Sequence, residues 1–132
     1  DFNLLDTLTA YENIALALSI QKVSVKEIEK RVQAIAQALN ITDVLDKYPY
    51  QMSGGQKQRV ASARALITDP KLILADEPTG NLDSKTELEV ISMLKSCVSE
   101  YGQTLVMITH DETIAQMADR MIVIEDGKVV RA

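Results

Sequence analysis

Short apolar runs alternate with helical patterns in the second half of the chain, and this alternation most constrains the fold. The apolar run at residues 72–75 is typical of a strand buried on both faces, residues 104–108 predict a second buried strand, and residues 121–124 predict a third strand. Helical patterns separate them, at residues 84–101 and from 111 to about 118. Strands that alternate with helices in this way predict an α/β fold, in which right-handed crossovers join the strands of a parallel sheet.

Two local expectations complete this half of the chain. The helix that starts at Ser84 is expected to end at Gly102. The residues at 125–128 predict a hairpin turn, after which residues 129–130 pair back. The inward face of the helix is expected to carry Leu88, Ile91, Leu94 and Val98.

The first third of the chain shows only helical patterns. Thr7 or Thr9 is placed to cap a first helix, which includes Ile14 and Leu18, and a second helix follows Ser24. We therefore expect a small all-helical unit. Apolar residues of its second helix recur on one helical face: Ile28, Val32, Ile35 and Leu39.

Composition excludes several classes of function. The 132 residues are 46% hydrophobic and 25% charged, which is ordinary for a globular protein. No apolar run reaches the roughly 18 residues that span a bilayer, so a membrane role would come from a partner. The net charge of −5 and the 4% aromatic content disfavour nucleic-acid binding, which depends on phosphate neutralisation and base stacking. The single cysteine, Cys97, allows no internal disulfide, and its expected role is packing.

Two adjacent carboxylates follow the first apolar run. Asp76 and Glu77 come just past the expected carboxyl end of a buried strand, where open parallel sheets bind ligands. Like charges beside an apolar core are unfavourable unless a cation compensates them. A Mg²⁺ ion held by one carboxylate would explain the pair, and the other carboxylate would be free to act as a base. The polar start of a loop explains the pair equally well.

A second candidate site opens the helical pattern that runs from Ser53 to about Ile67. A capping box explains Ser53 and Gln56, because each side chain then accepts a hydrogen bond from the other residue's backbone N–H. It does not explain Gly54 and Gly55, each of which costs about 1 kcal/mol relative to alanine inside a helix. Glycines leave the N–H groups of a helix start open to an anion. Contact with a phosphate therefore accounts for all four residues.

Other polar residues have open interpretations. His110 follows the second apolar run, at the same expected sheet edge as the two carboxylates, and a structural or a catalytic role is equally consistent with it. A local role is sufficient to explain Asp83, because an acid at the start of the following helix stabilises that helix. Lys57 and Arg59 add positive potential near residues 53–56, although solvated helix charges explain them better.

The order and spacing of four motifs resemble those of the ATP-binding cassette (ABC) ATPases. The motifs are YQMSGGQKQR at residues 50–59, LILADEPT at 72–79, NLD at 81–83 and ITHD at 108–111. The resemblance covers essentially the whole chain. Met52 stands where the family most commonly has the leucine that begins its signature.

For the helix starts, the resemblance implies contact with ATP across a dimer. Ser53, Gly54, Gly55 and Gln56 would be the signature motif, which contacts the γ-phosphate of ATP held by the opposite subunit. Asp83 would be the D-loop acid that crosses the dimer interface. The implied partner is thus a second ATPase subunit, in a sandwich homodimer.

For the sheet edge, the resemblance implies hydrolysis of ATP with Mg²⁺. Asp76 would be the Walker B acid on the Mg²⁺ side. Glu77 would be the general base that polarises the attacking water, and His110 would be the switch histidine near the γ-phosphate. The chain would then belong to an ATP-hydrolysing subunit that powers a membrane permease.

Three further segments resemble the subfamily that works with FtsX-like permeases in macrolide export, lipoprotein release and antimicrobial-peptide resistance. They are TAYEN at residues 9–13, KYPYQM at 47–52 and EPTGNLD at 77–83. This resemblance implies a protein that exports or removes peptides, antibiotics or lipoproteins, with its permease contact around residues 2–11 and the helical unit. It also implies a cytoplasmic location, peripheral on the inner face of the membrane. No nucleic-acid partner is expected, as the net charge and aromatic content indicate.

No stretch of the sequence matches the phosphate-binding loop G-x-x-x-x-G-K-[ST]. The resemblance therefore implies the C-terminal portion of a P-loop NTPase cassette without its Walker A part. Residues 1–52 would be the helical, signature-bearing subdomain with the end of the Q-loop, and residues 53–132 the C-terminal part of the ATPase core. Such a portion is expected to be inactive alone. Its uncovered sheet edge predicts self-association as a dimer or higher oligomer, swapping included.

Two alternatives stay open. The first is a non-transport ABC ATPase of DNA repair or translation. Repair members insert long coiled coils or zinc modules, whereas the helical unit here is short and has no cysteine cluster; translation members usually carry two cassettes in one chain. The second is a naturally truncated regulatory module, which an upstream reading frame that encodes a phosphate-binding loop would exclude.

Overall fold

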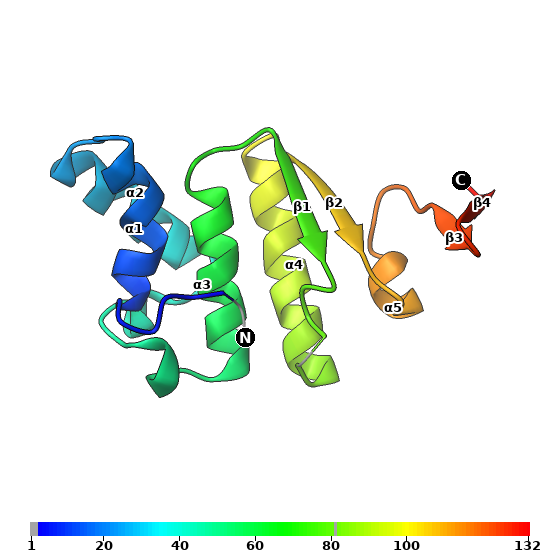
Figure 1. Ribbon diagram of the computed structural model, residues 1–132, viewed down its shortest axis with the longest axis horizontal. Helices are drawn as coiled ribbons and strands as arrows, with labels where there is room; N and C mark the ends of the chain where they lie inside the picture. Colours follow the sequence, from blue (N-terminus) through cyan, green and yellow to red (C-terminus); the bar gives the residue numbers. More distant parts are fainter. Residues whose placement is uncertain (1–2, 81) are drawn as a thin grey trace.

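The computed structural model describes residues 3–80 and 82–132. Figure 1 shows α1, α2 and α3 packed together, β1 and β2 lying along α4, and the β3–β4 hairpin at the far end of the molecule. The α/β class is confirmed. The elements are α1 (Ala10–Ile20), α2 (Val25–Ala38), the short 3-10 turns η1 (Thr42–Val44) and η2 (Pro49–Gln51), α3 (Gly54–Leu66), β1 (Leu72–Asp76), α4 (Ser84–Glu100), β2 (Thr104–Ile108), α5 (Glu112–Ala115), β3 (Val123–Glu125) and β4 (Lys128–Arg131).

Side-chain caps set the starts of the helices. The hydroxyl of Thr9 accepts from the N–H of Glu12 and begins α1, and Ser24 does the same for α2. Asp111 accepts two backbone N–H bonds at the start of α5, which ends at Ala115 rather than near residue 118. Each cap satisfies N–H groups that have no partner inside the helix.

The core lies mainly among α1, α2 and α3. All four apolar residues predicted for the inner face of α2 are buried: Ile28, Val32, Ile35 and Leu39. One polar side chain, Asn13, is buried with them at 1% exposure. Its amide oxygen accepts from the N–H of Leu5 at 2.8 Å, and its nitrogen donates to the carbonyl oxygens of Leu5 and Leu8. These bonds hold the segment before α1, at Leu5 and Leu8, against the helix and satisfy the buried amide of Asn13.

The predicted parallel pairing of the first two strands is confirmed. Leu72 lies opposite Thr104 and Asp76 opposite Ile108, and α4 forms the crossover between β1 and β2. The prediction that both faces of these strands are buried is wrong. Ile73 is buried in one cluster with residues of α4, whereas Leu74 is 75% exposed. Because side chains alternate between the faces of a strand, the outer face of this two-stranded sheet is apolar and open.

The third predicted strand does not join the parallel sheet. β3 pairs with β4 in an antiparallel hairpin, as the turn residues predict. Asp126 and Gly127 both have positive φ, 48° and 75°, which is the combination that a tight type I′ turn requires. The pairing is local, so it closes only a very short loop and costs little chain entropy.

The inner face of α4 differs in part from the prediction. Ile91 and Leu94 are buried as expected, but Leu88 is 40% exposed. The face is completed by Val90 and Cys97 instead, because α4 packs against α3 on one side and lies along the sheet on another (Figure 1). Cys97 therefore has the predicted packing role, and burial raises the pKa of its thiol. Gly102 follows the helix with φ of +64°, as a helix-ending glycine does.

Candidate functional site

Glu77 and His110 meet at the carboxyl edge of the parallel sheet. The N–H of Glu77 donates to the carbonyl oxygen of Ile108 at 2.9 Å, which continues the strand pairing by one residue. The backbone of Glu77 then turns with φ of +47°, a backbone conformation that residues other than glycine rarely adopt. Nδ1 of His110 donates to Oε1 of Glu77 at 2.8 Å. The two residues, 33 positions apart in the sequence, thus form one polar group.

Both side chains of this pair are open to solvent. The imidazole of His110 is 87% exposed and the carboxylate of Glu77 is 40% exposed. The hydrogen bond that His110 donates to Glu77, followed by the negative charge of Glu77, raises the pKa of His110 above its ordinary value. A carboxylate that water can reach and that an imidazole orients is able to accept a proton from that water.

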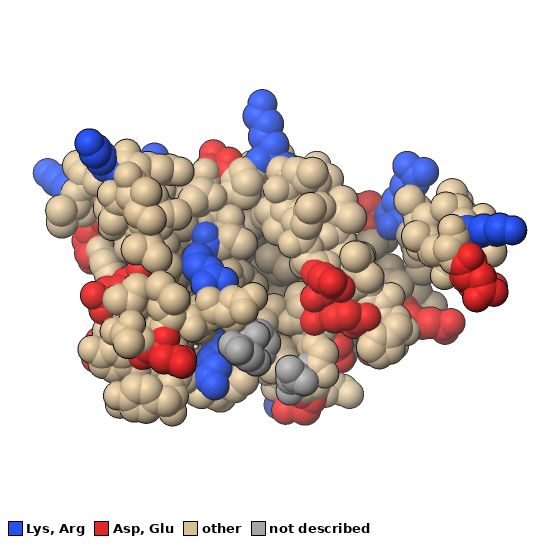
Figure 2. Space-filling model, in the orientation of Figure 1, with Lys and Arg blue, Asp and Glu red and all other residues tan. Residues whose placement is uncertain are grey.

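Asp76 lies beside this pair as the last residue of β1, with its side chain exposed. Figure 2 shows acidic side chains gathered where β1 and β2 end. No group of three metal-ligating side chains occurs within residues 3–80 and 82–132. A single carboxylate still fits Mg²⁺, because this ion usually takes one or two protein carboxylates and completes its shell with water and phosphate oxygens.

Residues 53–56 form the predicted capping box at the start of α3. The hydroxyl of Ser53 accepts from the N–H of Gln56 at 3.1 Å, and Oε1 of Gln56 accepts from the N–H of Ser53 at 2.9 Å. The N–H groups of Gly54 and Gly55 make no hydrogen bond to any described residue. These two donors point out of the helix start, where they are able to bind an anion.

The two glycines also have a packing role that the sequence did not indicate. A methyl group on Gly55 would lie 2.5 Å from Cγ2 of Thr86, and one on Gly54 would lie 3.3 Å from Cδ2 of Leu82. Gly55 therefore permits the start of α3 to approach the start of α4 closely. Periodicity within α3 carries no signal for this contact, because its partner is on another helix.

Asp83 caps α4, as its local interpretation predicts. Its carboxylate accepts from the N–H of Thr86 at 2.8 Å, and this hydrogen bond lowers the pKa of Asp83. Asn81, in the same motif, lies outside the described residues. Just before it, the hydroxyl of Thr79, which is 5% exposed, donates to Glu87 of α4 at 2.6 Å. This buried bond ties the loop after Glu77 to α4 and was not predicted.

The expectation that Arg59 is a solvated helix charge is wrong. Its side chain is 12% exposed, and its guanidinium forms an ion pair of 3.1 Å with Glu89 of α4. The sequence contains no signal for this pair, which joins residues 30 positions apart.

The candidate residues thus form two groups on one side of the molecule. In Figure 1 the carboxyl ends of β1 and β2 lie toward the same side of the molecule as the first turns of α3 and α4. The first group is Asp76, Glu77 and His110, and the second comprises residues 53–56 and Asp83. Among the described residues, no hydrogen bond or ion pair joins the two groups directly.

No helix in the described part of the chain is long and apolar enough to cross a membrane.

Residues 1–80 match the sequence profile of the family described as ABC transporter. The uncharacterized ABC transporter ATP-binding protein YvcR of Bacillus subtilis (strain 168) is 50% identical over 128 residues, which are 97% of this chain and 49% of that protein. The bacitracin export ATP-binding protein BceA of Halalkalibacterium halodurans is 46% identical over 129 residues, 98% of this chain and 51% of that protein.

Two solved structures of the cassette MJ0796 are similar to the chain. The dimeric structure, described as that of a bacterial ABC transporter cassette, has a TM-score of 0.83 at 42% identity and covers 98% of this chain and 58% of that chain. The other is the dimeric structure of a post-hydrolysis state bound to ADP and Pi, with a TM-score of 0.82. The chain spans about half the length of the curated relatives it matches.

Proposed function

Since the chain belongs to the ABC transporter family of ATP-binding proteins, we propose that it supplies the signature and hydrolysis residues of an ATPase subunit. The observation that carries this proposal is the 2.8 Å contact between His110 and Glu77 at the carboxyl edge of β1 and β2. It pairs a proton acceptor with the group that orients it. The ADP and Pi bound to MJ0796 support hydrolysis as the reaction of the family.

Glu77 acts as the general base in this proposal. Its exposed carboxylate accepts a proton from the water that attacks the γ-phosphate, while the hydrogen bond from His110 keeps it oriented. His110 also faces the phosphate from the end of β2. Asp76 is the residue that would hold Mg²⁺, through its exposed carboxylate. The ion neutralises negative charge on the phosphates when it is bound.

Residues 53–56 contact the γ-phosphate of ATP held by a second ATPase subunit. The free N–H groups of Gly54 and Gly55 support this role, because they are aligned donors at a helix start. Asp83, at the start of the neighbouring helix, contributes to the same interface between subunits. In this arrangement residues 1–52 are the helical subdomain with the end of the Q-loop. Residues 53–132 are the C-terminal part of the ATPase core, and a longer ATPase supplies the Walker A part.

The subunit powers a membrane permease, which is FtsX-like in our proposal. It is cytoplasmic and peripheral on the inner face of the membrane. The name of BceA, a bacitracin export protein, supports peptides or antibiotics as the material exported or removed, and lipoproteins are the further class. The permease contact is proposed on the helical subdomain and the segment before it, of which residues 1–2 lie outside the described part of the chain.

A Glu77→Gln variant of the full-length ATPase tests the hydrolysis step. The amide keeps the size of the carboxylate but accepts no proton, so ATP turnover is expected to be lost while ATP still binds. The ATP-bound dimer is then expected to accumulate in size-exclusion chromatography. Glu125→Gln, at the exposed end of β3, is the matched control and keeps its activity. Unchanged turnover in Glu77→Gln would remove Glu77 from this role.

A further inference from the structure

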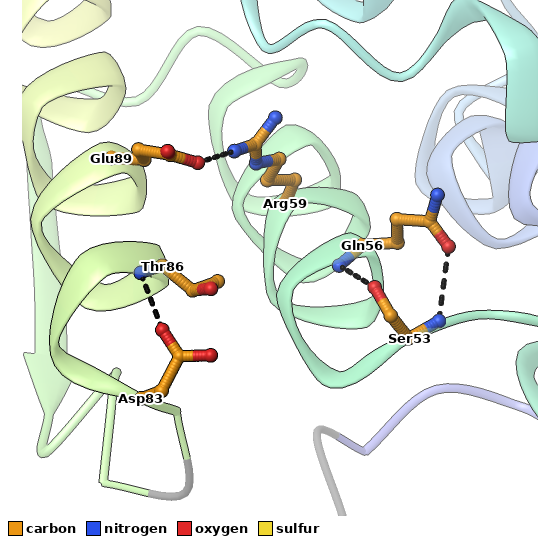
Figure 3. Close-up of polar contacts among 6 residues, drawn as sticks. All are labelled: Ser53, Gln56, Arg59, Asp83, Thr86 and Glu89. Carbon is orange, nitrogen blue, oxygen red and sulfur yellow. Dashed lines mark hydrogen bonds and ion pairs between the residues drawn. The ribbon is translucent and has the colours of Figure 1, made fainter.

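Two helices that begin at separate candidate motifs lie side by side. α3 begins after its cap Ser53, and α4 begins after its cap Asp83. Figure 3 shows both starts at the same end of the packed helices, with Arg59 reaching from α3 toward Glu89 on α4. The two motifs are therefore connected through the contact between these helices.

This contact has two levels. At the first, Gly55 leaves room for Thr86, whose Cγ2 would be 2.5 Å from a methyl group on residue 55. About one turn further, Nη2 of Arg59 donates to Oε2 of Glu89 at 3.1 Å. Residues three or four positions apart share a helix face, so Gly55 with Arg59 and Thr86 with Glu89 form two facing stripes. The first level limits how close the helices come, and the second limits how they slide or rotate.

The Arg59–Glu89 pair differs from a surface ion pair. The side chain of Arg59 is only 12% exposed, and its Nε is buried without a hydrogen-bond partner among the described residues. Glu89, which is 47% exposed, supplies the carboxylate that compensates the withdrawn charge. Removing the partner of a buried charge has a larger effect than removing the partner of an exposed one. The pair therefore restrains the position of α3 relative to α4.

We propose that Arg59 and Glu89 are positioning residues for the nucleotide, which keep residues 53–56 and Asp83 in one arrangement. This inference rests on the proposed function, in which both segments face ATP at the subunit interface. Loss of the pair lets the start of α3 shift relative to that of α4. The N–H groups of residues 53–56 and the carboxylate of Asp83 are then less often in their binding positions at the same time.

The test is Glu89→Gln in the full-length ATPase, a change that removes the charge and keeps the size of a half-exposed side chain. We expect the KM for ATP to rise roughly threefold to fivefold, as loss of a partly exposed ion pair implies. The kcat is expected to change little, because the sheet-edge residues are untouched. The melting temperature is expected to fall by a few degrees, because the amide leaves the largely buried guanidinium without an opposite charge, so the kinetics are measured well below it.

Rescue and a matched control separate positioning from packing. The exchanged pair, Arg59→Glu with Glu89→Arg, restores an ion pair between the helices and is expected to return the KM toward the parental value. Glu89→Asp, which keeps the charge, is the conservative rescue if the exchanged pair does not fold. Glu27→Gln removes the Arg31–Glu27 ion pair, also 3.1 Å long but within α2, and is expected to leave the KM unchanged.

The outcomes distinguish failure of the proposed function from failure of the positioning role. A parent ATPase without ATP-dependent turnover would contradict the proposed function itself. With an active parent, an unchanged KM in Glu89→Gln would overturn the positioning role. A KM that rises only at temperatures close to the lowered melting temperature would assign the pair to stability alone, and would also overturn the positioning role. A raised KM at a temperature well below the melting temperature of every variant, reversed by either rescue variant, supports the inference.

Discussion

At the scale of single residues, Glu77 and His110 form a hydrogen-bonded pair whose charge depends on pH. The hydrogen bond that the imidazole donates to Glu77 favours the protonated ring and raises the pKa of His110. A raised pKa in the folded state means that the pair stabilises the fold at pH values below the ordinary histidine pKa of about 6.5. This contribution is lost as the pH rises through the raised pKa of His110. Solvent screens the exposed pair, so its main effect is on orientation.

A Glu77→Gln variant of the 132-residue chain is expected to lower the pKa of His110 toward its ordinary value. The amide keeps a hydrogen-bonding oxygen but loses the charge that favours the protonated ring. NMR titration of the imidazole resonances measures the change directly, because His110 is the single histidine. Glu112→Gln, nearby on α5, is the control. An unchanged pKa in Glu77→Gln would show that the two side chains do not pair in solution.

At the scale of elements, the approach of α3 to α4 depends on a residue without a side chain. The Cγ2 of Thr86 occupies the space into which a methyl group on Gly55 would project. Threonine is β-branched and has few rotamers in a helix, so relief of this clash needs a change of its rotamer or a shift of α4. Gly54 differs, because its neighbour is the flexible end of Leu82 at 3.3 Å. The two adjacent glycines therefore make different demands on the packing.

Gly55→Ala is expected to destabilise the chain by about 1–3 kcal/mol, as overpacking does, partly offset by the better helix propensity of alanine. Thr86→Ala removes the obstructing methyl group and keeps the backbone N–H that Asp83 caps. The double variant is therefore expected to recover most of the loss. Urea unfolding of the single and double variants gives the coupling energy, with Gly54→Ala as the milder control. Additive effects in this cycle would contradict the close contact.

At the scale of the whole molecule, the outer face of the parallel sheet is apolar and uncovered. Leu74 is 75% exposed and its register neighbour Val106 is 49% exposed. Figure 2 shows no charged side chain over this part of β1 and β2. Parallel strands are normally covered on both faces, so this face favours association.

The 132-residue chain by itself is accordingly expected to self-associate. Leu74→Lys combined with Val106→Lys adds two positive charges to the apolar face, and we expect this variant to shift the population toward the monomer. Static light scattering over a range of concentrations measures the shift. Val25→Lys replaces an apolar residue that is 83% exposed on α2, and serves as the control. A clean monomer of the parent chain at high concentration would contradict the expectation.

Much of the fold and of the sheet-edge site was predictable because its signals are local or follow from topology. Thr9, Ser24 and Asp111 cap helices through bonds to residues at most three positions away, so their own neighbourhood is sufficient. Glu77 and His110 could be placed together because the carboxyl ends of adjacent parallel strands share one edge.

The sequence by itself determined the helix starts, the order of the elements, the β3–β4 turn and the residues at the sheet edge. Only the tertiary structure decided which strand β3 pairs with, that Leu74 is exposed, that Gly55 makes room for Thr86, and that Arg59 reaches Glu89. The physical reason is the range of the interactions. Caps and turns are bonds within a few residues, whereas helix packing and the coverage of a sheet depend on surfaces that the folded chain brings together from distant positions.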